Sequence, residues 1–154
     1  NYLNQVSEGR LSSESKLQIR AMLREVTEIE SIGDSCYNLA RTINHKYRGN
    51  EDFTEKQYSH IHQMFQLTDD ALNQMVSLVE DEGHQVDVNK SFNLENEINN
   101  YRSQLKNQNV LDVNNKEYDY QMGVHYMDLI GECEKLGDYI VNVVEARTDM
   151  KEKK

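Results

Sequence analysis

Two stretches of the chain repeat the same pattern of chemically capable residues. Glu30 to Asn38 and Glu134 to Asn142 both read Glu-x-(Ile/Leu)-Gly-Asp-x-x-x-Asn, and the two copies lie 104 residues apart. In each copy the Glu and the Asp are four residues apart, so on a helix both carboxylates lie on one face. Carboxylate oxygens are hard donors that suit iron, manganese, magnesium or zinc.

Two interpretations of these carboxylate pairs stay open at this point. Like charges at i and i+4 repel mildly, and a cation, either a basic side chain or a metal ion, would relieve that repulsion. In the first interpretation Glu30 and Asp34 hold one metal ion, and Glu134 and Asp138 hold a second one. The other is a solvated acidic face, since two ligands do not make a site and the chain has a formal charge of −10.

Four amphipathic helices are expected to position these residues. Thr54-Glu55-Lys56-Gln57 is a capping box, and Gly83 and the Asn114-Asn115 pair separate neighbouring helices. Connections of roughly 5–8 residues place consecutive helices antiparallel. The sequence therefore predicts an all-α, elongated, antiparallel up-down-up-down four-helix bundle. Its apolar residues recur three or four apart over about residues 12–47, 54–82, 88–109 and 117–150.

The first of these helices carries an apolar stripe, which we expect to face the core. Glu30, Asp34 and Asn38 lie on a flank away from it. A glycine inside a helix costs about 1 kcal/mol relative to alanine, so its recurrence at Gly33 and Gly137 predicts close approach between helices. The stripe comprises Ile29, Ile32, Gly33, Cys36, Leu39, Ala40 and Ile43.

At these residues the sequence resembles the PhoU family, whose helical repeats carry a signature commonly written Leu-Glu-Arg-Ile-Gly-Asp-His-Ala. The corresponding stretches run from Ile29 to Cys36 and from Cys133 to Ile140. Residues 9–15 and 21–24 are similar to the matching region of the PhoU-like cytoplasmic C-terminal domain of bacterial sodium/phosphate cotransporters. The resemblance covers nearly the whole chain.

The resemblance implies two three-helix repeats, each with the motif on its third helix. On that template residues 1–154 form one PhoU-like helical domain, with part of repeat one followed by a complete repeat two. We therefore expect a fragment of a longer chain. The usual Arg and His of the signature are replaced by Ser31 and Ser35 in the first copy, and by Lys135 and Tyr139 in the second.

The function implied by the resemblance is regulation of phosphate uptake, not catalysis. We expect a cytoplasmic regulatory domain associated with sodium-dependent phosphate uptake, on the cytoplasmic side of the bacterial inner membrane. Its partner is the membrane transport domain of the same longer chain or a phosphate transporter. A free-standing PhoU-like adaptor linking phosphate transport to signalling and a purely structural oligomerisation bundle are the alternatives, and a homo-oligomer is compatible with each.

Metal binding is also implied by the resemblance, because several family members bind multinuclear clusters through the motif acids. Glu30, Asp34, Glu134 and Asp138 therefore carry over as candidate ligands. The replaced signature residues leave fewer supporting donors around each pair. We expect metal to be bound weakly or not at all in the isolated chain.

The composition argues against several other classes of function. The 27 acidic against 17 basic residues repel a phosphate backbone, so no nucleic-acid partner is expected. No apolar run reaches ten residues, which predicts no membrane insertion by this segment. The sequence has no Glu-x-x-His pair, nucleophile motif or glycine-rich phosphate loop, and we expect no enzyme. Cys36 and Cys133 are predicted to be small core residues.

Overall fold

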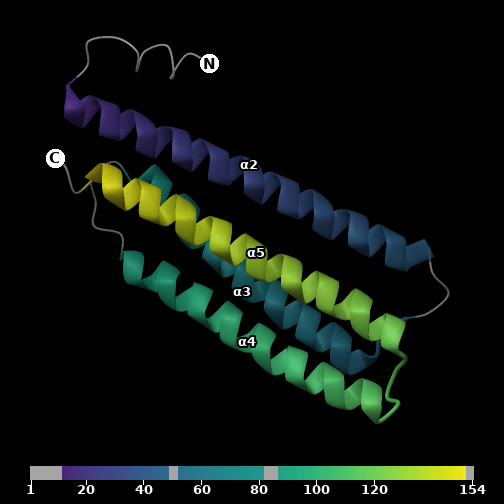
Figure 1. Cartoon of the computed structure of the whole chain (residues 1–154). Helices are drawn as coiled ribbons and strands as arrows, with labels where there is room; N and C mark the ends of the chain where they lie inside the picture. The colour runs from purple at the N-terminus through teal and green to yellow at the C-terminus, as the bar shows by residue number, and fades with distance from the viewer. Residues whose placement is uncertain (1–11, 49–51, 82–86, 152–154) are drawn as a thin grey trace.

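The computed structural model describes residues 12–48, 52–81 and 87–151. Its helices are α2 (Ser13–Arg48), α3 (Glu55–Glu80), α4 (Val88–Asn114) and α5 (Tyr120–Lys151), and the described residues contain no strand. Consecutive helices run antiparallel (Figure 1). The 36 residues of α2 make a rod about 54 Å long. The expected all-α, elongated four-helix arrangement is confirmed.

Local side-chain chemistry sets the helix ends. The capping box at the start of α3 is present: Gln57 N donates to Thr54 Oγ1 (3.1 Å), and Thr54 N donates to Gln57 Oε1 (3.0 Å). The helix α4 continues to Asn114, past the expected end near residue 109. Asp119 accepts from Met122 N (2.8 Å), so α5 begins at Tyr120, three residues later than expected.

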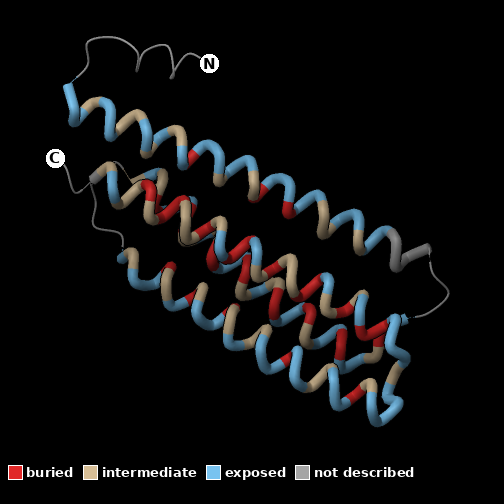
Figure 2. Tube along the Cα trace, in the orientation of Figure 1, coloured by how far each residue is buried: buried red, intermediate tan, exposed pale blue. Residues whose placement is uncertain are grey.

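The helices α3, α4 and α5 form a three-helix bundle, and α2 lies on its outside. Each of α3, α4 and α5 packs against the other two, whereas α2 packs only against α5 among the described helices. Figure 2 shows the buried residues concentrated where α3, α4 and α5 meet. Ile98 of α4 and Ile130 of α5, both 0% exposed, lie in that core.

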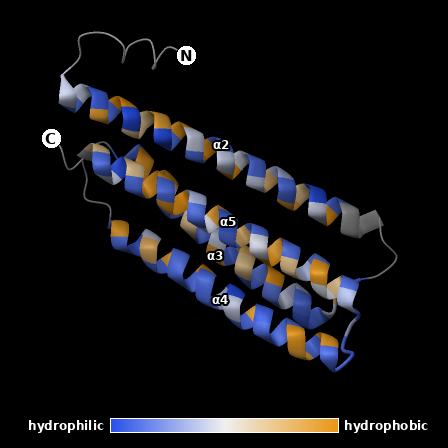
Figure 3. Ribbon diagram, in the orientation of Figure 1, coloured by the Kyte–Doolittle hydropathy of each residue, from blue (hydrophilic) through white to orange (hydrophobic). Residues whose placement is uncertain are grey.

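Outside this core the helices carry hydrophilic residues with apolar ones between them, as along α2 (Figure 3). None of the helices in the described ranges combines the length and the apolar character needed to cross a membrane.

The apolar stripe of α2 that was expected to face the core points mostly away from it. Of its members only Ile32 is buried and Leu39 half-buried, whereas Ile29 is 44% and Ile43 42% exposed. Two series of residues on α2 share the three-and-four spacing of a helix face, and the more polar series is the one that faces α5. We refer to the other series as the outer stripe of α2: Met22, Val26, Ile29, Gly33, Cys36, Ala40 and Ile43.

The cysteine and the glycine of the first motif stretch are less closely packed than those of the second. Cys133 is fully buried, and burial raises the pKa of its thiol to about 12, whereas Cys36 is exposed and the expectation of a core residue is wrong there. A Cβ built on Gly137 would lie 3.4 Å from Ile98 Cδ1, but one built on Gly33 meets no described atom within 4 Å. The predicted close approach therefore holds only for the second copy.

Hydrogen bonds from the repeated positions join α2 to α5 reciprocally. Asn38 Nδ2 donates to Glu132 Oε1 (3.4 Å), and Asn142 Nδ2 donates to Glu28 Oε2 (3.2 Å). Glu28 and Asn38 correspond to Glu132 and Asn142 in the repeat, so an approximate two-fold rotation relates the two bonds. The buried Ser35 hydroxyl adds a bond to Glu132 Oε1 (2.7 Å).

Arginines strengthen the same interface near the C-terminal end of α5. Arg24 Nη2 contacts Glu145 Oε2 at 3.0 Å. Arg147 Nη1 lies 3.6 Å from Oε2 of the buried Glu25, and its Nη2 donates to the Val79 carbonyl (2.6 Å). Arg147 therefore links α2, α3 and α5.

Replacing Glu132 tests the role of these bonds. Glu132→Ala removes the carboxylate acceptor of both Asn38 and the buried Ser35 hydroxyl, which keeps only the backbone carbonyl of residue 132 (3.4 Å), and we expect the free energy of unfolding to fall by about 1–2 kcal/mol. Glu30→Ala is the control, because Glu30 is exposed, and should change stability by less than about 0.5 kcal/mol. Urea unfolding followed by circular dichroism measures both. Equal effects of the two variants would contradict this account of the interface.

Candidate functional site

The first pair of motif carboxylates lies on the open side of α2. Glu30 and Asp34 are both exposed, and in the described part of the chain neither makes an ion pair or a side-chain hydrogen bond. The polar residues of this copy that bond to α5 are Asn38 and Ser35 instead. In the described structure, the first copy is thus an interface motif on one side and a solvated acidic face on the other.

The second pair of motif carboxylates lies on the side of α5 that faces α4, with Glu134 half-buried and Asp138 exposed. Arg102 Nε of α4 contacts Glu134 Oε2 in an ion pair whose side chains are 33% and 27% exposed. Glu95 of α4 lies close enough to Asp138, one helix turn farther along α5, for the two carboxylates to interact electrostatically, and Asn99 Nδ2 donates to Glu95 Oε1 (2.6 Å). The structure therefore combines Glu134 and Asp138 with three residues of α4 that the motif did not indicate.

The spacing of Glu95, Asn99 and Arg102 explains how α4 supplies these partners. The residues are separated by four and three positions, which places them on one face of the helix. That polar row on α4 was a signal in the sequence, but α4 is polar on most of its surface. The pattern alone could not show which polar row faces α5.

The electrostatics of this cluster are those of crowded carboxylates beside one guanidinium. Partial desolvation raises the pKa of Asp138 above its usual 3.8, and the negative charge of Glu95 raises it further. The Arg102 guanidinium acts in the opposite direction. A basic side chain thus supplies the cation that the i, i+4 spacing demands at the second pair.

The metal role of Glu30, Asp34, Glu134 and Asp138 stays a prediction. In residues 12–48, 52–81 and 87–151, no three His, Cys, Asp or Glu side chains are placed to hold an ion together. At the second pair Arg102 lies where a metal's charge would act, so the arrangement shown here fits a metal poorly. Binding there requires Arg102 to move away from Glu134.

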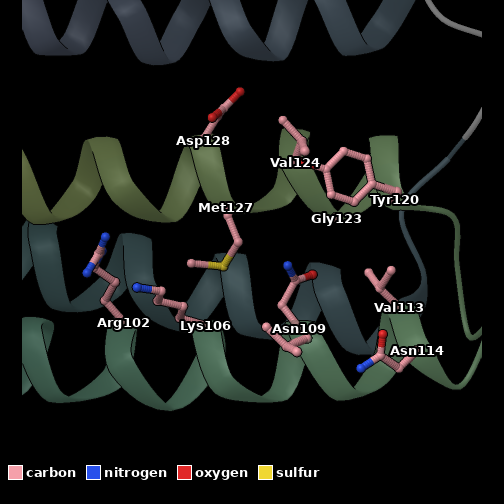
Figure 4. A pocket seen from close by; sticks show the side chains of 11 residues that line it. Arg102, Lys106, Asn109, Val113, Asn114, Tyr120, Gly123, Val124, Met127 and Asp128 are labelled. Atoms are coloured by element: carbon pink, nitrogen blue, oxygen red, sulfur yellow. The ribbon is translucent and has the colours of Figure 1, made fainter.

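A groove of about 470 Å³ between α4 and α5 continues from Arg102 toward the other end of the bundle. Lys106 and Arg102 lie at one end, and Tyr120 and Asn114 at the other (Figure 4). Gly123 lets the two helices meet here, because a Cβ at this position would lie 2.9 Å from Val113 Cγ2. The groove combines an apolar floor with two cationic side chains at one end.

The comparison with known families identifies one match. Residues 61–146, more than half of the chain, match the PhoU domain. The matched segment runs from the first turns of α3 through α4 to near the end of α5, and it includes the second motif copy. No curated protein and no solved structure matches the chain.

Neutralising Asp138 tests the crowded cluster. The pKa of Asp138 is higher in the folded state than in the unfolded state, so folding favours the protonated acid. This contribution of Asp138 to the free energy of unfolding is complete below the pKa of the unfolded state, and it is lost as the pH rises through the pKa of the folded state. We expect Asp138→Asn to stabilise the protein at neutral pH by about 0.5 kcal/mol, with the gain disappearing on acidification below the usual pKa of 3.8.

Urea unfolding between acidic and neutral pH measures this difference. The control is Asp34→Asn, which removes an exposed carboxylate at the equivalent position of the first copy. It should leave the pH profile of stability unchanged. A gain from Asp138→Asn that is constant across this pH range would show that repulsion from Glu95 is not its cause.

Calorimetric titration with iron, manganese and zinc tests the metal prediction. We expect little heat from the native chain, because Arg102 already neutralises Glu134, and more heat from Arg102→Gln. The double variant Glu134→Gln, Asp138→Asn should then give none. Equal heats from all three proteins would remove the metal role from the second motif.

Proposed function

The chain belongs to the PhoU domain family, and we propose on that basis that it is the cytoplasmic regulatory domain of a bacterial sodium/phosphate cotransporter. The family indicates regulation related to phosphate transport in general and is a family of regulatory and adaptor domains, not enzymes. The proposal places a membrane transport domain in the same longer chain. The domain itself then lies on the cytoplasmic side of the inner membrane.

The observation that carries the proposal is the family match over the three-helix bundle. Residues 61–146 contain most of α3 and α5 and the whole of α4, which form the common core. The motif of α2 repeats that of α5 outside the matched segment and packs against it with reciprocal bonds. Both features support a doubled helical module of the PhoU type.

The surface chemistry supports an interaction with protein in preference to phosphate itself. A chain with a formal charge of −10 repels a free phosphate anion. Exposed apolar side chains such as Val110 and Val124 flank the α4–α5 groove and would suit contact with another polypeptide. The proposed regulation acts through helix surfaces, with the transport domain as partner.

Phosphate uptake by cells carrying the complete gene tests this proposal. Ile98→Asp places a charge in the core of the three-helix bundle, where Ile98 is 0% exposed, and should unfold the domain without shortening the chain. We expect sodium-dependent uptake of labelled phosphate to persist but to lose its response to external phosphate. Asn96→Asp changes an exposed residue on the same helix and should leave both the uptake and its response to external phosphate unchanged.

The outcomes separate the proposal from its alternatives. Membrane spans encoded in the same reading frame, together with altered regulation, support the cotransporter. A reading frame that encodes only helical repeats supports a free-standing adaptor and contradicts the cotransporter assignment. Unchanged regulation in Ile98→Asp, with the domain shown to be unfolded, contradicts a regulatory role and leaves a structural bundle.

A further inference from the structure

The groove between α4 and α5 sets cationic side chains beside apolar ones. Lys106 and Arg102 lie at one end, and apolar side chains such as Val124 and Met127 continue the groove away from them (Figure 4). Val110 is 55% and Val124 38% exposed, so the apolar wall is accessible to a ligand. Such a groove suits a ligand that carries an anionic group and an apolar group close together.

The groove is a separate surface from the outer stripe of α2. In the described structure α3 and α4 pack against α5 and not against α2, so they cover the side of α5 away from α2 (Figure 1). The approximate two-fold rotation between the motif copies then places whatever covers the outer stripe on the side of α2 away from α5. The groove is formed by α4 and α5 alone.

The cations of the groove have hydrogen-bond donors left for a ligand. Among the described residues Lys106 makes no ion pair, and Arg102 contacts Glu134 only through Nε, which leaves its two terminal NH2 groups as donors. The carboxylate of Asp128 also lines the groove but points away from Lys106 (Figure 4). Charges farther away than about 8 Å are largely screened at physiological ionic strength. The local positive charge therefore outweighs the formal charge of −10 of the whole chain.

Two asparagine side chains of α4 match the polar groups of a polypeptide backbone. The Tyr118 hydroxyl donates to Asn109 Oδ1 (2.6 Å), and no described residue accepts from Asn109 Nδ2. Asn114 lies at the other end of the groove from Lys106 (Figure 4). An amide side chain both donates and accepts hydrogen bonds, as a peptide group does. The tail of a lipid anion would use neither amide, so a peptide is the better match.

The spacing along α4 sets the length and the pattern of such a segment. From residue 106 to residue 114 the helix rises about 12 Å, which an extended chain spans in about four residues. Val110 lies about 6 Å along the helix axis from Lys106, close to the distance between residues i and i+2 of an extended chain. Side chains at i and i+2 point to the same side. An acidic and an apolar residue two positions apart can therefore contact Lys106 and Val110 together.

We propose that the α4–α5 groove binds an extended segment of a partner protein in which an acidic residue and an apolar residue are two positions apart. The acidic side chain pairs with Lys106 and Arg102, and the apolar side chain packs against Val110 and Val124. The choice of a protein as partner rests on the proposed function, and the inference adds the chemistry which that partner presents. A segment this short buries less area than a standard interface. We expect a dissociation constant on the order of 100 μM.

Binding of synthetic peptides to the full 154-residue chain tests the proposal. The probe is the fluorescent heptapeptide Gly-Ser-Asp-Ser-Leu-Ser-Gly, and fluorescence polarisation measures its dissociation constant. We expect the peptide with Asn in place of Asp, and the peptide with Ser in place of Leu, to bind about fivefold more weakly. Inorganic phosphate should not displace the probe, because phosphate lacks the apolar contact.

Replacing Lys106 tests the charged end of the groove. We expect Lys106→Gln to weaken binding of the Asp peptide about fivefold and to leave binding of the Asn peptide unchanged, because only the charged pair is lost. Lys90→Gln is the matched control, since Lys90 is an exposed lysine of the same helix outside the groove, and it should change neither.

Replacing Val110 tests the apolar wall. We expect Val110→Ser to weaken binding of the Asp peptide about fivefold, and Leu111→Ser to leave it unchanged. Val110 and the adjacent Leu111 are both 55% exposed, but Val110 lines the groove and Leu111 does not. All four replaced residues are exposed, so the variants should fold, and circular dichroism checks this.

Four results would overturn the proposal. These are no binding at several times the expected dissociation constant, equal binding of the Asp and Asn peptides, equal effects of Val110→Ser and Leu111→Ser, and displacement of the probe by inorganic phosphate. The proposed function is judged separately, by phosphate uptake in cells. Loss of the uptake response in Ile98→Asp without peptide binding upholds the function and rejects this inference. Peptide binding with an unchanged response upholds this inference and contradicts the function.

Discussion

Every other described helix packs against α5, and this constraint shapes the rest of the structure. The buried residues of a helix surrounded in this way extend along most of its length, from Met122 to Ala146. Small residues allow neighbours to come close, with Gly123 beneath Val113 and Gly137 beneath Ile98. The polar groups that α5 retains, such as Glu132 and Asn142, are bonded to α2.

The two motif copies show how one pattern serves two environments. Their Glu and Asn at the shared interface make the same bond in both directions, which accounts for two of the repeated positions without any ligand. The carboxylates four residues apart diverge: Glu30 is exposed, whereas Glu134 contacts Arg102. The difference comes from α4, which covers the second copy, while the described structure has no equivalent helix over the first.

Much of the fold could be predicted from the sequence, because periodicity and caps are local properties. The capping box at Thr54 and the four helices needed no knowledge of distant contacts. The face that α2 turns to α5 could not be predicted in the same way. Two series of residues had helical spacing, and the more apolar series was wrongly expected to be inside; polar bonds from Ser35 and Asn38 to Glu132 decide the orientation.

The candidate site was predictable only on the helix that carries the motif. The carboxylates of Glu134 and Asp138 lie on one side of α5, as the i, i+4 spacing requires. Their partners Arg102 and Glu95 depend on how α4 rotates about its axis, and most of its surface is polar. A helix with so weak an apolar face gives little information about its own orientation.

The attachment of α2 to a single helix has a consequence for the order of folding. The bundle of α3, α4 and α5 joins segments that are consecutive in the chain, and such local topologies assemble rapidly. The contacts of α2 span far longer loops, as between Arg24 and Glu145, which are 121 residues apart. A helix that contacts one neighbour and buries few apolar side chains should detach at a lower free energy than the bundle unfolds. The amides of α2 should therefore exchange with solvent through a partial opening that leaves the rest of the protein native.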